Sequence, residues 1–282
     1  MTVLRVEHRT TFVYAEPVSA SYNEARLTPS RGPGQRLLDS RLSIEPRTWS
    51  HDYVDYWGTA VTAFEVLREH EQLEIVAASR VELPDAAPSA PGDGNVWDVV
   101  AGPAFRDTMA AYLADSATTR APDDLMALAR EVSARAATPD EAASAVALVV
   151  RDGLEYVPGV TTVHTTAAEA WTAGKGVCQD VSHLVLGALR GLGIPARYVS
   201  GYLHPRPGAG IGETVTGESH AWVEWWAGGW RAFDPTNRTE VRADHVALGR
   251  GREYRDVSPL KGVYAGAGRG ELDVRVEITR VS

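Results

Sequence analysis

The chain contains a single cysteine, Cys178, among its 282 residues. One cysteine cannot form an intrachain disulfide or a metal site built from several thiolates. The fold must therefore depend on a hydrophobic core, and a chain of this length can bury a sufficient one. The composition, 44% hydrophobic and 23% charged, is that of a globular protein rather than a disordered or fibrous one. Cys178 itself is either a small buried apolar residue or a reactive thiol.

Charge and hydropathy argue against several classes of partner. The 28 basic and 37 acidic residues give a net charge of −9, which disfavours nucleic acid or an anionic membrane as the main partner. No uncharged apolar run approaches the ~18 residues of a membrane span, and charges interrupt the first eight residues where a signal peptide would be apolar. We therefore expect a cytoplasmic protein.

We also expect neither a metal nor a cofactor. No group of His, Asp or Glu has the spacing of metal ligands, and no calcium-binding loop is present. The glycine-rich stretch 208–212 lacks the strand and helix that flank a nucleotide-binding loop.

The first third of the chain is predicted to be an antiparallel β domain, residues 1–83. Its runs of β-branched and aromatic residues show no helical periodicity. Residues 84–97 are dominated by proline, glycine and small polar residues, which is typical of a linker. Residues 98–282 are then expected to form the second domain. The strands expected in the first domain include residues 4–14, 38–44, 60–66 and 73–77.

The second domain is expected to begin with helices and end with strands, so the whole chain is predicted to be α+β. Thr138 with Glu141, and Thr166 with Glu169, have the pattern of a capping box, which predicts a helix after each threonine. Apolar residues from Cys178 to Arg190 are too many for one helix face, so that helix should be buried on most sides. The expected strands are residues 197–203, 219–226, 230–234 and one around 272–278.

Cys178 lies at the predicted start of the buried helix. A thiol there faces unpaired backbone N–H groups and the positive end of the helix dipole, and both favour the thiolate. The preceding glycines, Gly174 and Gly176, allow a tight turn and leave room for a substrate. The N–H of Cys178 is then placed to donate to an oxyanion. The alternative is a structural cysteine that happens to begin a helix.

His220 and Asp234 are the best placed general base and orienting acid, because a nucleophilic thiol needs a base and the base needs a partner. A three-residue hairpin loop would place Trp226 opposite Trp230. Asp234 would then lie opposite Trp222, on the same face as His220 and diagonal to it. A two-residue loop would put Asp234 on the other face. The alternative is an exposed strand histidine and a turn-forming Asp-Pro pair.

Four neighbouring residues carry weaker signals. Gln179 could donate to an oxyanion through its side-chain amide. Trp222 belongs to a group of hairpin tryptophans that is expected to pack the core, although some of them could wall a substrate groove. Asp180, in the first turn of the helix, is expected to be structural. His183 lies off the Cys178 face of the helix and is expected to be a core histidine.

Four blocks of the second domain, in order and at characteristic spacing, resemble the core of bacterial transglutaminase-like proteins, which belong to the papain-like cysteine enzymes. The resemblance extends back to residues 156–159 and 165–169. Asn23, Arg26, Leu27 and Pro29 also resemble the β domain that precedes this core in one bacterial branch. The four blocks are residues 176–180 (GVCQD), 193–202 (GIPARYVSGY), 219–224 (SHAWVE) and 233–237 (FDPTN).

The resemblance implies a papain-like core in which Cys178 is the nucleophile, His220 the general base and acid, and Asp234 the residue that orients His220. It implies acyl transfer from a peptide or protein amide, or from a gamma-glutamyl-type amide, through a thioester. Hydrolysis, as in a cysteine protease or peptidase, is the expected outcome. Transfer to an amine, as in a transglutaminase, is the first alternative, and a non-catalytic binding module is the second.

Overall fold

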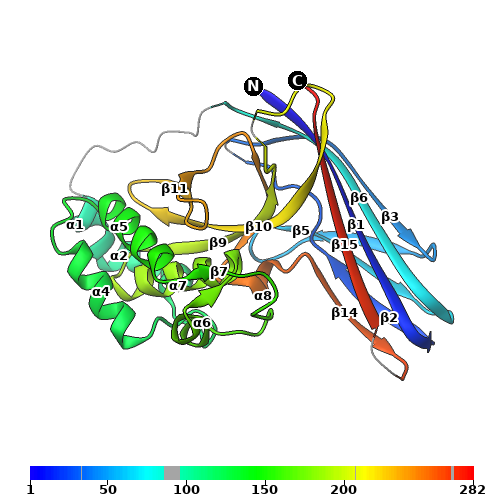
Figure 1. Ribbon diagram of the computed structural model, residues 1–282, viewed down its shortest axis with the longest axis horizontal. Coiled ribbons are helices and arrows are strands. Elements are labelled where there is room, and N and C mark those ends of the chain that lie inside the picture. The colour runs from blue at the N-terminus through cyan, green and yellow to red at the C-terminus, as the bar shows by residue number, and fades with distance from the viewer. Residues whose placement is uncertain (33, 86–95, 207, 268–269) are drawn as a thin grey trace.

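The computed structural model describes residues 1–32, 34–85, 96–206, 208–267 and 270–282. Helices gather on one side of the molecule and long strands on the other, and the two ends of the chain lie close together (Figure 1). The fold is α+β, as predicted. Most of the expected linker, residues 86–95, lies outside the described residues. None of the described helices combines the length and apolar character needed to cross a bilayer.

Two antiparallel sheets face each other in the strand-rich part. Strands β3, β6, β1 and β15 are neighbours in one sheet, and β14, β2, β5 and β4 form the other. Alternate residues of β1 and β6 are buried, including Leu4, Val6, Leu73 and Ile75, so each strand turns one face to the shared core. The N-terminal strands are β1 (Thr2–Val18), β2 (Ala20–Ala25), β3 (Arg36–Glu45), β4 (Ser50–Val54), β5 (Ala60–Val66) and β6 (His70–Leu83).

The C-terminal strands complete both of these sheets. Strand β14 (Leu260–Ala265) pairs with β2, and β15 (Gly270–Arg280) lies between β1 and β10. The sequence predicts that this segment belongs to the second domain, within residues 98–282. In the structure its strands instead pair mainly with strands of the first domain, which Figure 1 shows as red beside blue.

The helical layer is built around α7, which is buried on most sides as expected. The side chain of Thr138 accepts the Glu141 N–H at the start of α5, and Thr166 and Glu169 form a complete capping box at the start of α6, as predicted. The helices are α1 (Val96–Ala101), α2 (Pro103–Thr108), α3 (Ala110–Leu113), α4 (Asp123–Ser133), α5 (Pro139–Asp152), α6 (Ala167–Ala173), α7 (Cys178–Gly191) and α8 (Tyr254–Val257).

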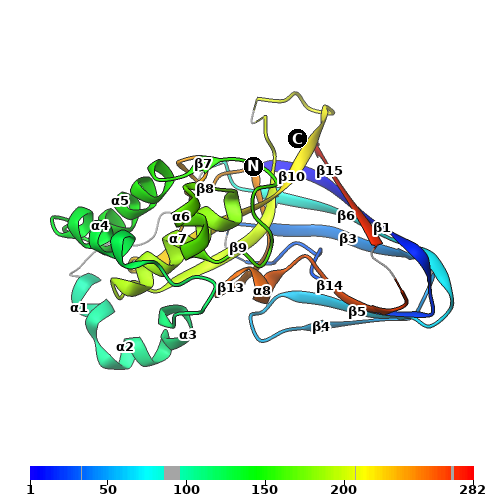
Figure 2. The same ribbon diagram turned by 60° about the horizontal axis from the view of Figure 1, so that its bottom comes forward.

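Strand β10 connects the two parts, because it pairs with β9 and β11 near the helices and with β15 at its other end (Figure 2). In the β10–β11 hairpin Trp226 pairs with Trp230, and Gly228 has a φ of 87°. The predicted three-residue loop and register are therefore confirmed. The remaining strands are β7 (Glu155–Tyr156), β8 (Lys175–Gly176), β9 (Ala196–Leu203), β10 (Thr214–Trp226), β11 (Trp230–Asp234), β12 (Thr239–Glu240) and β13 (His245–Gly251).

Candidate active site

The lone cysteine is the first residue of α7. The preceding helix ends at Gly174, which is left-handed with a φ of 63°. The Asp180 carboxylate accepts the Val177 N–H at 2.8 Å and so fixes the turn into α7. A Cβ at Gly176 would lie 2.7 Å from the Cβ of Asp180, so this turn requires glycine. Cys178 is left half-buried, with its backbone N–H among the donors that have no intrahelical acceptor.

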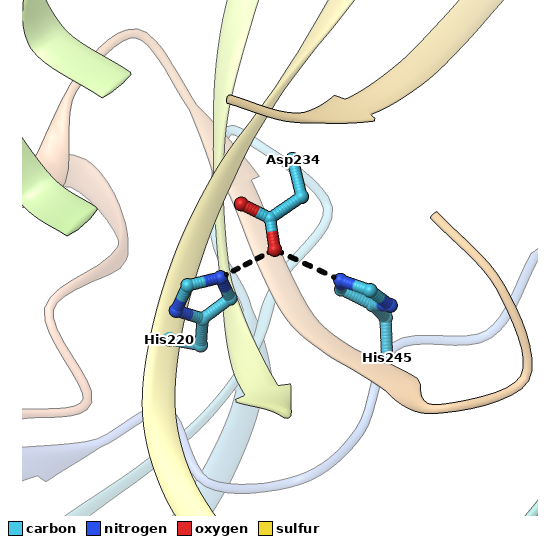
Figure 3. Close-up of side chains that lie close together, drawn as sticks. All are labelled: His220, Asp234 and His245. Carbon is cyan, nitrogen blue, oxygen red and sulfur yellow. Dashed lines mark hydrogen bonds and ion pairs between the residues drawn. The ribbon is translucent and has the colours of Figure 1, made fainter. Parts of the chain in front are cut away.

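His220 comes from β10 and is buried, with 6% of its surface exposed. Its Nε2 hydrogen-bonds Oδ2 of Asp234 at 2.8 Å (Figure 3). Nδ1 is therefore the ring nitrogen left to interact with Cys178. Burial lowers the pKa of His220, but hydrogen bonds with Asp234 and Cys178 outweigh it and raise this pKa from 6.5 to about 10. The ring is therefore an imidazolium at neutral pH, and it places a positive charge beside the Cys178 sulfur.

Asp234 ends β11 and is fully buried. Besides His220, its Oδ2 accepts the Asn237 side-chain amide at 2.7 Å and His245 Nε2 at 3.2 Å, and its Oδ1 accepts the Asn237 backbone N–H at 3.1 Å. Burial raises the pKa of Asp234, but the hydrogen bonds from the two histidines and Asn237 lower it well below its ordinary value. Asp234 is thus a fixed carboxylate that orients His220.

His245 is a component of the site that the sequence analysis missed. It begins β13, and its Nδ1 contacts Oδ1 of Asp244 at 2.5 Å while its Nε2 faces Asp234. Burial lowers the pKa of His245, but the hydrogen bonds to the two carboxylates raise it overall. The adjacent Asp244-His245 pair in the sequence was the available signal. No strand was expected there, so nothing placed the pair beside Asp234.

The same three side chains form the group of potential metal ligands found among the described residues. One ligand atom each from His220, Asp234 and His245 lies within 4.8 Å of the others. The spacing along the sequence did not predict this group. Nε2 of each ring hydrogen-bonds Oδ2 of Asp234, at 2.8 Å for His220 and 3.2 Å for His245, so the three ligand atoms already contact one another. The arrangement therefore suits a hydrogen-bonded network better than a metal centre.

A cavity of about 300 Å³ opens onto Cys178 and His220. Gln179, which follows the cysteine in the sequence, also lines this cavity. Its side-chain amide is the group that the sequence suggested as a donor to an oxyanion. The N-terminal β domain supplies one wall of this cavity, so it shapes the groove directly. The residues of that wall are His8, Thr10 and Phe12 of β1, with Leu272 and Val274 of β15.

The remaining expected residues have structural surroundings. Trp222 is 1% exposed, does not line the cavity and packs with its ring edge-on to His245, which agrees with a role in the core rather than in a groove. Asp180 accepts both the Val177 N–H and the Thr161 hydroxyl, as a structural cap would. His183 is fully buried, and its Nε2 accepts the Tyr254 N–H at 3.1 Å.

Comparison with known proteins covers both parts of the chain. The family model of the bacterial transglutaminase-like N-terminal region matches residues 4–82, and that of the transglutaminase-like superfamily matches residues 126–235. An uncharacterised protein of Mycobacterium leprae (strain TN) is 43% identical, and the match spans 99% of each chain. The chain belongs to the transglutaminase-like superfamily. All three residues of the candidate triad lie inside the matched core of this superfamily.

Two further comparisons extend over nearly the whole chain. An uncharacterised protein of Mycobacterium bovis (strain ATCC BAA-935 / AF2122/97) is 32% identical over 97% of this chain and 91% of its own length. A crystal structure described as that of a candidate cysteine protease from Cytophaga hutchinsonii has a TM-score of 0.76 and is 20% identical. The match covers all of this chain and 91% of the other. The two proteins therefore share one fold over the whole of this chain.

Proposed function

We propose that this protein is a cysteine hydrolase that cleaves a peptide or protein amide through a thioester on Cys178. The observation that carries the proposal is the contact of His220 with Asp234 at 2.8 Å, next to a cavity shared by His220 and Cys178. A nucleophilic cysteine, a histidine base and a carboxylate that orients the base are the groups needed for cysteine-based acyl transfer.

In the first half of the reaction the Cys178 thiolate attacks the amide carbonyl carbon and forms a C–S bond. The negative charge moves to the carbonyl oxygen, where the Cys178 N–H and the Gln179 amide are available as donors. The C–N bond then breaks as the imidazolium of His220 gives its proton to the leaving nitrogen. The products are a free amine and a thioester on Cys178.

In the second half the neutral His220 removes a proton from water, and the resulting hydroxide attacks the thioester carbonyl. The C–S bond breaks, the acid product leaves, and the thiolate and imidazolium are restored. Asp234 remains ionised throughout and holds the ring in one orientation. An amine in place of water would give transamidation with the same three residues.

The walls of the cavity favour a substrate with an apolar group beside the scissile amide. Phe12 of β1 and Leu272 and Val274 of β15 present apolar surface from the sheet that these two strands share, and Leu260 adds to it. Leu272 and Val274 are 58% and 47% exposed. Apolar walls with a few convergent polar groups are typical of small-molecule and peptide sites.

The first test is the rate of iodoacetamide labelling at pH 7, measured by intact mass on a protein whose only thiol is Cys178. We expect His220→Ala to slow labelling by about tenfold or more, because it removes the cation beside the sulfur. His164→Ala is the matched control, since this histidine is exposed. Equal labelling rates in all three proteins would contradict the proposed pair.

The second test incubates the protein with fluorogenic peptide amides, with and without an added primary amine. Release of the fluorophore without the amine, lost in Cys178→Ala, supports hydrolysis. Incorporation of the amine in competition with water would instead identify a transglutaminase. Turnover that persists in Cys178→Ala would rule out the thioester. A reactive Cys178 without turnover on any amide would favour a binding module.

A further inference from the structure

A second cavity, of about 610 Å³, lies where the N-terminal sheet meets the transglutaminase-like core. Leu4 of β1 and Arg280 of β15 line it from the sheet, and His204, Arg242 and His245 line it from the core. Cys178 and His220 do not line it. This cavity is therefore separate from the proposed catalytic pocket.

His204 lines this cavity and carries a hydrogen-bond donor that no described residue accepts. The side chain is buried, with 4% of its surface exposed, and burial lowers its pKa, so the ring is neutral at pH 7. Its Nδ1 accepts the Arg206 N–H at 3.2 Å, which places the ring proton on Nε2. That Nε2 is buried without a hydrogen-bond partner among the described residues.

Arg280 provides a second donor of the same kind. Its Nε is also buried without a hydrogen-bond partner among the residues that the structure describes. Within these described ranges, neither Arg280 nor Arg242, the two arginines of the cavity, has a carboxylate within 4 Å of its guanidinium. Buried donors are nearly always paired, so two of them at one cavity indicate a missing acceptor.

The two acidic residues at the cavity do not supply that acceptor. Asp85 pairs with the N-terminal amino group and accepts the Thr2 hydroxyl at 3.1 Å. Asp244 contacts His245 at 2.5 Å. Both carboxylates therefore have other hydrogen-bond partners, and neither lies within 4 Å of the guanidinium of Arg242 or Arg280, although the charge of Arg280 helps to lower the pKa of Asp85. The buried N–H donors of His204 and Arg280 stay without an acceptor among the described residues.

We propose that this cavity binds a small molecule through a carboxylate or phosphate group, with Arg280, Arg242 and His204 as the donors. A guanidinium offers parallel N–H groups that match the oxygens of either anion. The volume leaves space for an organic portion beyond the anionic group, because cavities of roughly 300–1,000 Å³ are typical for small ligands. This inference is independent of the proposed hydrolase activity.

The test is isothermal titration of the full chain with inorganic phosphate and, separately, with succinate, at pH 7 and constant ionic strength, with chloride as the reference anion. We expect saturable binding of at least one of them. The preferred anion identifies the ligand as a phosphate or a carboxylate compound. Binding should persist after Cys178 is alkylated with iodoacetamide, because that reagent occupies the other cavity.

Arg280→Gln and Arg242→Gln should each weaken binding by about tenfold or more, the loss expected for a charge-assisted hydrogen bond. Arg275→Gln is the matched control, since Arg275 is an exposed residue of β15 that does not line the cavity. Arg242 is exposed, so its replacement keeps the test valid if Arg280→Gln does not fold. The proposal is overturned if neither anion binds, if both variants bind like the wild type, or if alkylation of Cys178 abolishes binding.

Discussion

At the scale of single residues, the candidate active site is a balanced set of buried charges. His220 and His245 both have raised pKa values and share Asp234, while Asp244 contacts the far side of the His245 ring. The carboxylates of Asp234 and Asp244 therefore offset the positive charge of the His220 imidazolium and favour the charged form of His245. A thiolate at Cys178 then adds one negative charge next to a cation, which is less costly than an isolated buried anion.

Replacing Asp234 by asparagine should disturb this balance in a way that depends on pH. Asp234→Asn keeps the shape but leaves two rings without their shared carboxylate, so we expect a loss of about 3 kcal/mol in the free energy of unfolding at pH 7. The pKa of His220 should fall towards its ordinary 6.5. Urea denaturation and an NMR titration of the histidine ring protons measure the two effects.

The direction of each pKa shift determines how the free energy of unfolding changes with pH. The pKa of Asp234 is lowered in the folded state, so its stabilising contribution is present above about 4 and is lost as the pH falls below it. The pKa of His220 is raised, so its contribution is present below 6.5 and is lost as the pH rises towards 10. Stability of the wild type should therefore decline on both sides, and Asp234→Asn should flatten both limbs. Parallel profiles for the two proteins would contradict this account.

At the scale of elements, local patterns in the sequence predicted helices, strands and a hairpin well, whereas the pairing of strands distant in the sequence could not be predicted. The β10–β11 hairpin could be placed because two strands joined by a short loop have only a few registers, and the parity of His220 and Asp234 selected one of them. Strand β13 could not be placed. It is seven residues long, contains Gly249 and Gly251, and pairs with β9, about 45 residues away in sequence. His245 was missed for this reason.

Strand β9 shows how closely the strands around the site are packed. A Cβ at Gly201 would lie 2.3 Å from the Val246 carbonyl oxygen and 2.4 Å from the Trp222 ring. Gly201→Ala must therefore displace β13 or the tryptophan that contacts His245. We expect it to lower the free energy of unfolding by about 1–3 kcal/mol and to slow alkylation of Cys178.

Gly210→Ala is the control for this substitution, because a Cβ at Gly210 has no atom within 4 Å. It should change stability by less than about 0.5 kcal/mol. Urea denaturation compares the two variants, and iodoacetamide labelling reports on the site. A Gly201→Ala protein that is as stable and as reactive as Gly210→Ala would show that β9 and β13 can separate without cost.

At the scale of the whole molecule, the two parts are one structural unit rather than independent domains in series. The core of the β-rich part includes Tyr202 of β9 and Val246 of β13, and its strand β15 pairs with both β1 and β10. The sequence predicted β15 as a strand but not its partners. Alternation of apolar and polar residues determines which face of a strand is buried. The choice of β1, more than 250 residues away in the sequence, as the partner of β15 depends on the assembled sheet.

This arrangement predicts that residues 96–282 do not fold alone. Without β1, strand β15 has a free edge, and the buried side chains of Tyr202, Val246 and Ile278 lose their apolar cover. Produced alone, this fragment should be insoluble or lack a cooperative thermal transition by circular dichroism. Produced together with residues 1–85, it should form a soluble complex in which Cys178 is labelled at the rate of the full chain. A soluble fragment 96–282 with that same rate would mean that the N-terminal sheet contributes only its wall of the catalytic cavity.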